Sequence, residues 1–406
     1  MNIDFYADIL RALMTEGETV TARIQGIAAG GSGVARPGGK SVFVPLAAPG
    51  DLLRFRITKE RGNWAEAEIL EVLEPSPLRV TAPCALYGRC GGCSLQHLSY
   101  EAQIQAKTAI LRDAFTRIGG VTPPEIRTRA SQPFEYRNRF QFHAQPGGSG
   151  ESACGFMERK SARLVALEDC PVAEAGLRKA LKEGKIRPPE GKKRFAVYSR
   201  QATFLVEGET ERGRVSILSK ELAMDVKVFF QSNAAMLEPL IGDLTQAAAD
   251  ADKSLPLADI YCGVGTFAAF LGAEFAGVDL VEENKAALSL ARENVRGNAC
   301  AKKINCHALK DTAWVTTKAP ALNRRKASWG FMVLDPPREG LSAPFAKWLA
   351  ANGPELAAYV SCDPATLARD SRILLQGGYA LKELTLYDFY PQTAHIESLA
   401  LFSRRA

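Results

Sequence analysis

The 406-residue sequence has no apolar run near the roughly 20 residues that a membrane-spanning helix needs. Its opening stretch, MNIDFYADILRALMTEGETV, lacks the basic start and the continuous apolar core of a secretory signal. The cysteines number nine, and an odd count in a chain without such a signal argues against a framework of disulfides. We therefore expect a cytoplasmic protein without a membrane partner, whose reduced thiols are free for metal binding or catalysis.

Internal repeats and low-complexity segments are also lacking, so the length predicts two or three ordinary globular domains. The net charge is only +6, but it is unevenly distributed. Residues 101–200 hold 19 basic against 11 acidic residues, 201–300 hold 8 against 15, and 301–350 hold 9 against 3. A basic central segment favours a polyanionic partner. The alternative is that these charges form only the solvated surface of a basic protein.

Short strands dominate residues 14–74, where ETVTARIQGI, SVFVPL, DLLRFRITKERG and WAEAEILEVL are separated by glycine-rich turns. This density predicts an OB-like β-barrel, a fold that often grips single-stranded nucleic acid, although an SH3-like barrel without a ligand has the same pattern. Residues 75–220 mix helices and strands around clustered cysteines, which predicts an α+β domain. Strand–helix alternation over residues 221–406 predicts a doubly wound, Rossmann-like α/β domain.

The segment DIYCGVGTFAAFLG, residues 259–272, runs from an apolar strand through Gly-x-Gly into a helix. Glycines let the backbone approach a ligand at the carboxyl edge of a sheet. Asp279 ends the next apolar strand, where a carboxylate would meet ribose hydroxyls. The pattern favours S-adenosylmethionine, with NAD as the rival ligand and a ligand-free glycine turn as a third interpretation.

A further strand, FMVLDPPREG, ends in Asp335 followed by two prolines, which hold the carboxylate rigidly at the same sheet edge. This segment resembles the fourth motif of nucleic-acid methyltransferases. Enzymes that methylate the amino group of adenine need a planar aromatic residue after the prolines. Arg338 stands there, which argues against amino-group methylation.

The stretch YVSCDPATLARD places Cys362 between a strand and a helix that an Asp-Pro pair begins. The positive end of this helix favours thiolate over thiol. A thiolate beside a methyl donor suggests addition to C6 of a pyrimidine, which activates C5 for methylation. A base must then remove the C5 proton, and FYPQTAHIES offers His395 and Glu397. The alternative is a buried structural cysteine.

In this order, VFFQSN, DIYCGVGTF, LDPPREG, VSCDPATLARD and FYPQTAHIES resemble the RNA uracil-5 methyltransferase family. Residues 14–220 resemble the branch of that family with an N-terminal TRAM barrel and an iron–sulfur cluster. The resemblance implies S-adenosylmethionine as donor, 5-methyluridine as product, Cys362 as nucleophile and Glu397 as base. It also implies that the following residues contact the donor: Gln231, Tyr261, Thr266, Asp279 and Asp335.

The sequence departs from the family at three donor-contact positions. Tyr261 and Thr266 stand where phenylalanine and asparagine are usual, and both replacements can still stack or form hydrogen bonds. Leu309 occupies a position that is often polar, and Asp311 is close to it in sequence but out of register.

Four cysteines have the spacing of a metal site. CALYGRCGGC contributes Cys84, Cys90 and Cys93, and EDCP contributes Cys170 much further along. Four thiolates can hold a 4Fe–4S cluster or a tetrahedral zinc ion equally well, and free thiols are a third interpretation. The resemblance implies the cluster, and Cys170, which precedes a proline, fits the fourth position better than Cys154.

In EYRNRFQFH, Arg137 and Arg139 alternate with aromatic side chains. This pattern suits phosphate contacts combined with base stacking. The alternative is an ordinary strand with one charged face. The basic segment around it and the RNA substrates of the family favour RNA contact.

We therefore predict a monomeric, three-part enzyme that acts on structured RNA. A TRAM barrel (14–74) and a cluster-bearing central domain (75–220) hold the RNA, and the domain at 221–406 methylates a flipped-out uridine. The arrangement resembles members that act on 23S ribosomal RNA, with transfer RNA as the alternative substrate. One rival is a cytosine-5 methyltransferase, whose nucleophile usually follows a proline, whereas Cys362 follows a serine. The other rival, a non-catalytic RNA-binding protein, is disfavoured because the predicted nucleophile and base are both present.

Overall fold

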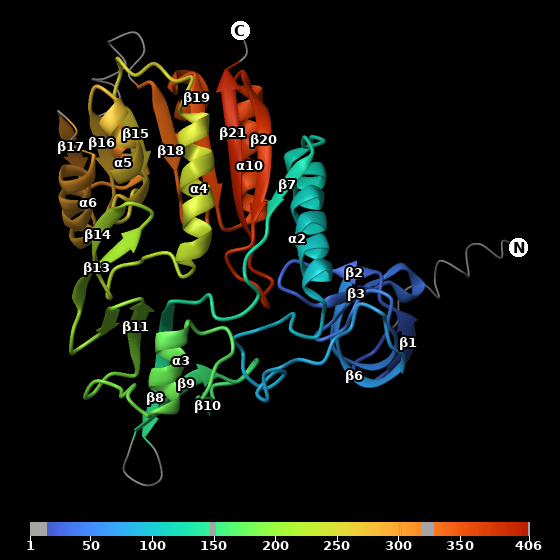
Figure 1. Ribbon diagram of the computed structural model, residues 1–406. Coiled ribbons are helices and arrows are strands. Elements are labelled where there is room, and N and C mark those ends of the chain that lie inside the picture. Colours follow the sequence, from blue (N-terminus) through green and yellow to red (C-terminus); the bar gives the residue numbers. More distant parts are fainter. Residues whose placement is uncertain (1–13, 147–151, 300, 302, 318–328, 405–406) are drawn as a thin grey trace, which may run out of the picture. The chain divides into compact units, whose positions relative to one another are not determined.

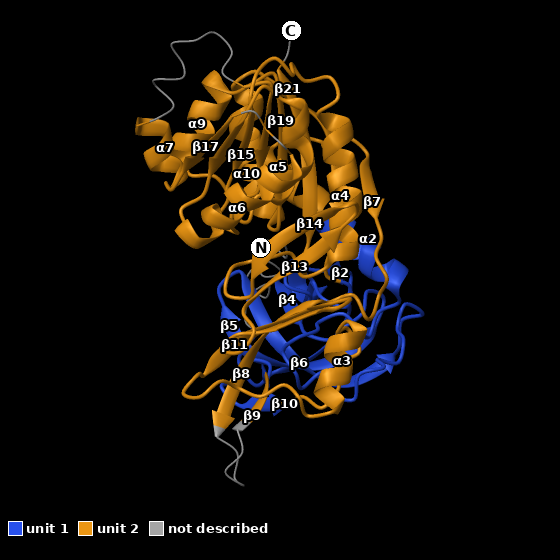
Figure 2. Cartoon of the chain, turned by 60° about the vertical axis from the view of Figure 1, so that its left-hand side comes forward, with its two compact units in different colours: residues 1–110, 156–165, 391–394 blue, residues 111–155, 166–390, 395–406 orange. Residues whose placement is uncertain are grey.

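The computed structural model describes residues 14–146, 152–299, 301, 303–317 and 329–404 (Figure 1). The chain forms two compact units that are interleaved along the sequence (Figure 2). The first unit extends to residue 110 and also includes residues 156–165 and 391–394, and the second comprises the remaining segments. The three predicted domains, with boundaries at 75 and 221, stay predictions.

The first unit is built on a six-stranded sheet in the order β1-β5-β6-β4-β3-β2. Its strands are β1 (Thr19–Arg23), β2 (Gly26–Ile27), β3 (Gly33–Ala35), β4 (Ser41–Val44), β5 (Leu52–Arg61) and β6 (Trp64–Glu74), with the short helix η1 (Pro37–Gly39). Alternate residues of β5 face the core, where Leu53, Phe55 and Ile57 are buried. This alternation confirms the predicted N-terminal module of short strands.

The middle of the sequence forms two smaller sheets and three helical segments. A five-stranded sheet follows the order β10-β9-β8-β11-β12, and β13 and β14 form an antiparallel hairpin. The strands are β8 (Arg139–Pro146), β9 (Ser152–Met157), β10 (Leu164–Ala166), β11 (Arg194–Arg200), β12 (Thr203–Val206), β13 (Arg212–Ile217) and β14 (Lys220–Asp225). The helices are α2 (Tyr100–Ala114), η2 (Phe115–Gly119) and α3 (Ala175–Lys182).

An eight-stranded sheet in the order β17-β16-β15-β18-β19-β21-β20-β7 forms the centre of the second unit. Its strands are β7 (Ile126–Arg129), β15 (Leu257–Ile260), β16 (Val278–Val281), β17 (Ile304–His307), β18 (Phe331–Leu334), β19 (Leu356–Ser361), β20 (Tyr379–Tyr387) and β21 (Glu397–Arg404). Strand β21 runs antiparallel to both of its neighbours, and the other pairs are parallel.

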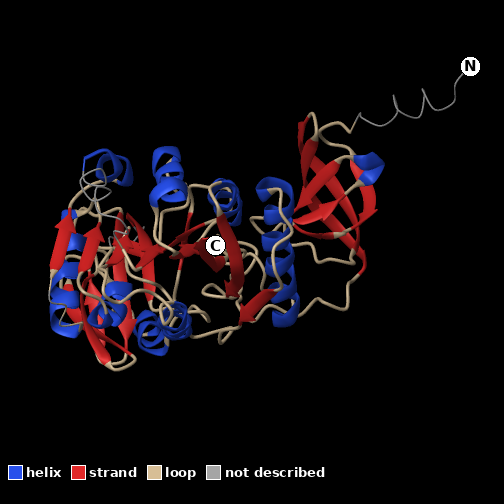
Figure 3. Cartoon of the chain, turned by 90° about the horizontal axis from the view of Figure 1, so that it is seen from above, coloured by secondary structure: helices blue, strands red, loops and turns tan. Residues whose placement is uncertain are grey.

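Helices lie on both faces of this sheet (Figure 3). They are α4 (Ala234–Ala247), α5 (Thr266–Leu271), η3 (Gly272–Glu274), α6 (Lys285–Asn298), α7 (Asp311–Thr317), α9 (Ala343–Asn352) and α10 (Pro364–Gln376). The strand–helix alternation that predicted a doubly wound α/β architecture is confirmed. In such a sheet the carboxyl ends of the parallel strands meet at one edge, where ligands bind.

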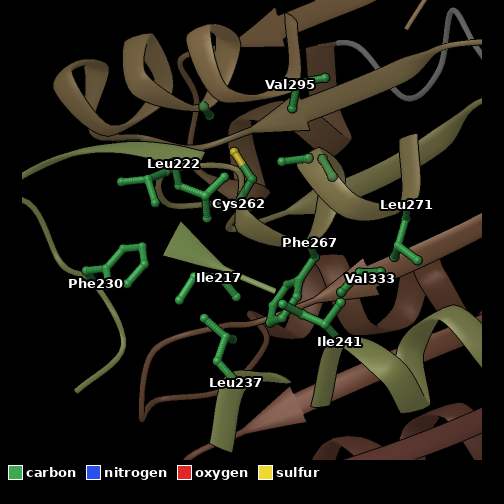
Figure 4. Close-up of a cluster of buried hydrophobic side chains, with 14 of the residues drawn as sticks. Ile217, Leu222, Phe230, Leu237, Ile241, Cys262, Phe267, Leu271, Val295 and Val333 are labelled. Carbon is green, nitrogen blue, oxygen red and sulfur yellow. The ribbon is translucent and has the colours of Figure 1, made fainter. Parts of the chain in front are cut away.

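A large apolar cluster fills the space between this sheet and the helices that cover it. Figure 4 shows the thiol of Cys262 among the apolar side chains of this cluster. Burial raises the pKa of that thiol well above its usual value. Cys262 therefore packs as a small apolar residue, although it lies inside the glycine motif.

Candidate active site

A cavity of about 960 Å³ lies at the carboxyl ends of β15, β16, β18 and β19. The residue that directly follows each of these strands lines it, namely Tyr261, Glu282, Asp335 and Cys362. Glu397, the first residue of the antiparallel strand β21, lines it as well. The strand order therefore brings a glycine loop, a thiol and three carboxyl groups into one site.

The cavity contains every predicted catalytic, donor-contacting and RNA-contacting residue except Asp279. These residues are Arg137, Arg139, Gln231, Tyr261, Thr266, Asp335, Cys362 and Glu397. Three further residues also line it, namely His395, Glu282 and Asp311. His395 was the other candidate for the base, and neither Glu282 nor Asp311 was a predicted site residue. The region near Leu309, where the sequence departs from the family, contributes to the cavity wall through both Leu309 and Asp311.

The glycine loop after β15 has a backbone that few side chains tolerate. Gly263 and Gly265 have φ values of 53° and 75°, in the left-handed region. A Cβ on Gly265 would lie 2.8 Å from Cα of Ala291, so glycine permits the close approach of α6. The N–H of Gly263 donates to Oε2 of Glu282 at 3.1 Å. The loop and the end of β16 are therefore tied together at the cavity wall.

Asp279 differs from its expected place. It is the second residue of β16, is 3% exposed, and accepts hydrogen bonds from Nδ2 of Asn305 (2.6 Å) and Nε1 of Trp329 (2.7 Å). Burial alone would raise the pKa of this carboxyl, but the hydrogen bonds from Asn305 and Trp329, together with the His307 ring 3.9 Å away, outweigh it and lower the pKa. Its carboxylate thus binds side chains of the surrounding structure and does not line the cavity.

Glu282 is the acidic residue that the sequence interpretation missed. It follows the apolar pair Leu280–Val281, which continues β16 beyond Asp279. The pairing of Ile260 with Val281 places Glu282 level with Tyr261, at the cavity. The apolar pair was the signal in the sequence that the strand ends two residues later than expected.

Gln231 shows the behaviour of a ligand-binding residue. It lines the cavity, its side chain is 8% exposed, and its Oε1 atom has no hydrogen-bond partner within the described part of the chain. Buried polar atoms are nearly always paired, so an unpaired acceptor in a cavity wall points to a bound group that supplies the donor. Asn233 caps the N-terminus of α4 nearby and holds this segment in place.

Cys362 has the predicted local structure but not the predicted protonation. Asp363 caps α10 by accepting from the N–H groups of Ala365 and Thr366, with Pro364 at the first helical position. Burial, followed by the charges of Glu397 and Asp335, nevertheless raises the pKa of the Cys362 thiol to about 12. The expectation that the helix start favours the thiolate is therefore wrong, because burial and these two charges favour the protonated thiol.

Asp335 and Glu397 form a strongly interacting pair of carboxyl groups. Burial, followed by the charge of Glu282, raises the pKa of Asp335 to about 7. Burial, followed by the charge of Asp335, raises the pKa of Glu397 well above its usual value. Arg338 opposes this effect and lowers the pKa of Glu397. Two buried acids that share one region resist simultaneous ionisation, a property suited to proton transfer.

Cationic and aromatic groups complete the cavity wall. Nη2 of Arg338 and Nδ1 of His395 are 3.1 Å apart, and the ring of His395 meets Tyr390 edge-on with centroids 5.7 Å apart. The guanidinium of Arg137 lies 5.9 Å from the centroid of Tyr390 and 5.2 Å from that of Phe140. This alternation of cations and rings suits a polyanion that carries bases.

The predicted metal site has no comparable support. Among the described residues, no three His, Cys, Asp or Glu side chains are arranged so that they could hold a metal ion. Cys84, Cys90 and Cys93 belong to the first unit, where the N–H of Gly92 lies 3.4 Å from Sγ of Cys90. Burial, and to a smaller extent the charge of Cys84, raises the pKa of Cys90. Cys170 belongs to the second unit and is buried.

Among the residues that the structure describes, no helix is both long enough and apolar enough to cross a membrane.

The sequence matches two families of known proteins. Residues 199–405 match the family described as tRNA (uracil-5-)-methyltransferase, and residues 14–70 match the TRAM domain. The TRAM match confirms the prediction for the N-terminal strands.

Individual relatives extend over nearly the whole chain. It is 32% identical to an uncharacterized RNA methyltransferase of Treponema denticola, over 90% of this chain and 94% of that protein. It is 31% identical to the 23S rRNA (uracil(1939)-C(5))-methyltransferase RlmD of Chromohalobacter salexigens, over 94% of this chain and 88% of that protein. The tRNA (uracil-54, C5)-methyltransferase of Pyrococcus abyssi, solved with S-adenosyl-L-homocysteine, superimposes with a TM-score of 0.68 at 23% identity. That match covers 94% of this chain and 100% of the other, and it shows a shared fold.

Proposed function

Because the chain belongs to the RNA uracil-5 methyltransferase family, whose members depend on S-adenosylmethionine, we propose that it methylates C5 of a uridine in 23S ribosomal RNA through a covalent bond between Cys362 and C6. The observation that carries this proposal is the meeting of Cys362, Asp335 and Glu397 in one cavity with the glycine loop. A nucleophile, a base and a donor-type loop are the three parts that the reaction needs.

The proposed reaction has three steps. The thiolate of Cys362 adds to C6 of uracil, and the electrons of the C5–C6 bond move toward C5 and O4. C5 then attacks the methyl carbon of the donor, and the carbon–sulfur bond breaks to leave S-adenosylhomocysteine. The carboxylate of Glu397 takes the C5 proton, the C5–C6 double bond forms again, and the thiolate leaves.

The raised pKa values of Cys362 and Glu397 fit this order only if substrate lowers them. The thiol of Cys362 holds its proton because burial and two nearby carboxylates raise its pKa to about 12. Arg338 lowers that pKa, as well as the pKa of Glu397. We propose that RNA binding brings Cys362 into its reactive thiolate form by release of the thiol proton to water, which couples activation of the thiol to the presence of the uracil.

For the donor, we propose contacts from Gln231, Tyr261, Thr266 and Asp335, as expected from the sequence, and from Glu282 in the place expected for Asp279. The unpaired Oε1 atom of Gln231 supports a contact of this kind. A carboxylate at the end of the second strand is the usual partner of ribose hydroxyls in such sheets, and Glu282 stands there.

For the RNA, we propose that Arg137 and Arg139 contact phosphate groups at the mouth of the cavity, which they line. The relatives named as 23S rRNA enzymes favour ribosomal RNA. The family description and the Pyrococcus abyssi structure keep transfer RNA as the second candidate.

The test is incubation of the protein with labelled S-adenosylmethionine and transcripts of 23S rRNA and tRNA, followed by mapping of the label. Label on C5 of a 23S uridine is the expected result. Label only in tRNA would show that tRNA is the substrate, and label on cytosine would show that the protein is a cytosine-5 methyltransferase. A protein that binds no S-adenosylmethionine would be the non-catalytic RNA-binding protein instead.

We also propose that Cys84, Cys90, Cys93 and Cys170 hold a 4Fe–4S cluster, with zinc as the alternative. The support is the spacing of these cysteines and the proximity of the Gly92 N–H to Cys90, a contact typical of cluster thiolates. Iron, sulfide and zinc analysis of anaerobically purified protein distinguishes the two metals. Cys170→Ser should lose the metal, whereas Cys154→Ser, whose thiol lies 3.5 Å from the carbonyl of Ile186, should keep it.

A further inference from the structure

The loop that follows β18, residues 335–342, carries two groups of the reactive site, Asp335 and Arg338. It contains no regular secondary structure, and Pro337, Arg338 and Glu339 are exposed. One backbone hydrogen bond lies within it, from the N–H of Gly340 to the carbonyl of Pro337 at 2.8 Å. Two buried aspartates outside the loop, Asp311 and Asp370, accept hydrogen bonds from its final residues.

Asp311 holds the loop from the donor side. Its Oδ2 atom accepts from the N–H of Ser342 at 3.1 Å and from the hydroxyl of Tyr261 at 2.7 Å. Asp311 is 8% exposed, begins α7 and lines the cavity. Tyr261 is the residue that follows β15 in the glycine loop, so one carboxylate oxygen joins the donor loop to the end of the 335–342 loop.

Asp370 holds the loop from the side of the nucleophile. Its Oδ2 atom accepts from the N–H of Leu341 at 2.8 Å and from the hydroxyl of Tyr359 at 2.8 Å. Asp370 is 1% exposed and lies on α10, which begins directly after Cys362 and its cap. Tyr359 lies on β19, three residues before Cys362.

The backbone of the loop packs closely against Asp370. Gly340 has a φ of 74°, and a Cβ there would lie 2.6 Å from Oδ2 of Asp370. Nη2 of Arg369 donates to the carbonyl oxygens of Glu339 (2.9 Å) and Leu341 (3.2 Å), while its Nε donates to Oδ1 of Asp370. Side chains of α10 thus hold the carbonyl groups of Glu339 and Leu341 and the N–H of Leu341, while the N–H of Gly340 donates to the carbonyl of Pro337 within the loop.

The two contacts repeat one design on consecutive residues. A buried carboxylate oxygen receives one tyrosine hydroxyl and one loop N–H, at Leu341 on one side and at Ser342 on the other. Tyr261 belongs to the donor loop and Tyr359 to the strand that ends at Cys362. A hydrogen bond to a buried carboxylate is among the stronger ones in proteins, and leaving such a group unpaired is costly.

We propose that Asp311 and Asp370 are positioning residues, which fix the 335–342 loop between the donor loop and the nucleophile through the pairs Tyr261–Asp311 and Tyr359–Asp370. Asp311 acts on donor binding, because its partner forms the wall of the donor site. Asp370 acts on methyl transfer, because its partner Tyr359 lies on the strand that ends directly before Cys362. This assignment depends on the proposed function, since both effects are defined by that reaction.

The test separates donor affinity from the rate of transfer in the full-length protein. Asp311→Ala should weaken S-adenosylmethionine binding in calorimetry by about tenfold, with a smaller change in the single-turnover rate. Asp370→Ala should lower the single-turnover rate on 23S rRNA by about tenfold or more and leave donor affinity within about twofold. Tyr261→Phe and Tyr359→Phe remove only a hydroxyl and should show weaker versions of the same split, even if an alanine variant fails to fold.

Tyr379→Phe is the matched control. It also removes a buried tyrosine hydroxyl, which donates to the carbonyl of Pro354 at 2.6 Å, and Tyr379 does not line the cavity. In double variants, Tyr261→Phe should add little to Asp311→Ala, because both remove the same contact. If wild-type protein binds the donor but the four variants behave like Tyr379→Phe, the positioning roles are wrong. Failure of wild-type protein to bind the donor would instead overturn the proposed function.

Discussion

The indole Nε1 of Trp329 lies 2.7 Å from Oδ2 of Asp279, and this hydrogen bond holds the aspartate behind the cavity. Glu282, three residues further on, faces the cavity instead and accepts from the N–H of Gly263. Two acidic residues on one short segment thus have separate positions, one in the packing of the sheet and the other at the cavity wall.

Substitutions at these two residues should therefore have different effects. Glu282→Gln should weaken S-adenosylmethionine binding by about tenfold to hundredfold, because a charged hydrogen-bond partner is lost. Asp279→Asn should lower the free energy of unfolding, because the buried donors of Asn305 and Trp329 lose their charged acceptor. Calorimetry with the donor and urea unfolding distinguish the two effects. Normal donor affinity in Glu282→Gln would contradict the assignment.

Cys362→Ala should abolish methyl transfer, with a loss of more than about a thousandfold, while donor binding and folding are kept. The other thiol that lines the cavity, Cys262, is buried among apolar side chains, and its pKa is raised well above the usual value, so it does not replace Cys362 as the thiolate. Cys306→Ala is the control, because its thiol is exposed on β17 and does not line the cavity. Transfer by Cys362→Ala near the wild-type rate would rule out the nucleophile role.

Glu397→Gln should trap methylated RNA on the protein, because the amide cannot take the C5 proton and the thiolate cannot leave. The adduct is visible as a shifted band on a denaturing gel with labelled RNA. Glu383→Gln, an exposed residue that pairs with Arg127, should give no such band. If Glu397→Gln gives none either, His395 becomes the next candidate for the base.

The stability of the protein should depend on pH through Asp259. Burial raises the pKa of this carboxyl from 3.8 to about 8, although the N–H of Ala268 donates to it. Because the folded-state pKa is the higher one, this group contributes its full stability below about pH 4, and the contribution falls as the pH rises to about 8. Relative to wild type, Asp259→Asn should gain up to about 1.4 kcal/mol of unfolding free energy per pH unit over this range. Urea unfolding at several pH values measures the difference, and parallel curves for the two proteins would contradict it.

Much of the site followed from the sequence because three of the candidates directly follow an apolar strand. Asp335 and Cys362 directly follow β18 and β19, and parallel strands necessarily bring such residues to one edge. Tyr261 obeys the same rule after β15. The N-terminal strands were equally visible, since alternation of polar and apolar residues is a local property.

Other features are properties of space and were decided by the tertiary structure. The start of α10 favoured a thiolate at Cys362, but burial and the charges of Glu397 and Asp335, which are distant in sequence, reverse that preference. Asp311 was out of register in sequence and yet lines the cavity, because its partners Tyr261 and Ser342 come from other segments.

The sequence by itself therefore determined the architecture and the edge at which chemistry occurs, because hydrophobic period and strand-end motifs are read locally. The three-dimensional fold alone decided which carboxylate faces the ligand, which groups are protonated and what holds the 335–342 loop. Desolvation, charge interaction and hydrogen bonding depend on distance through space, and for Asp279, Glu282 and Asp370 that distance is set by the packing of the sheet and its helices.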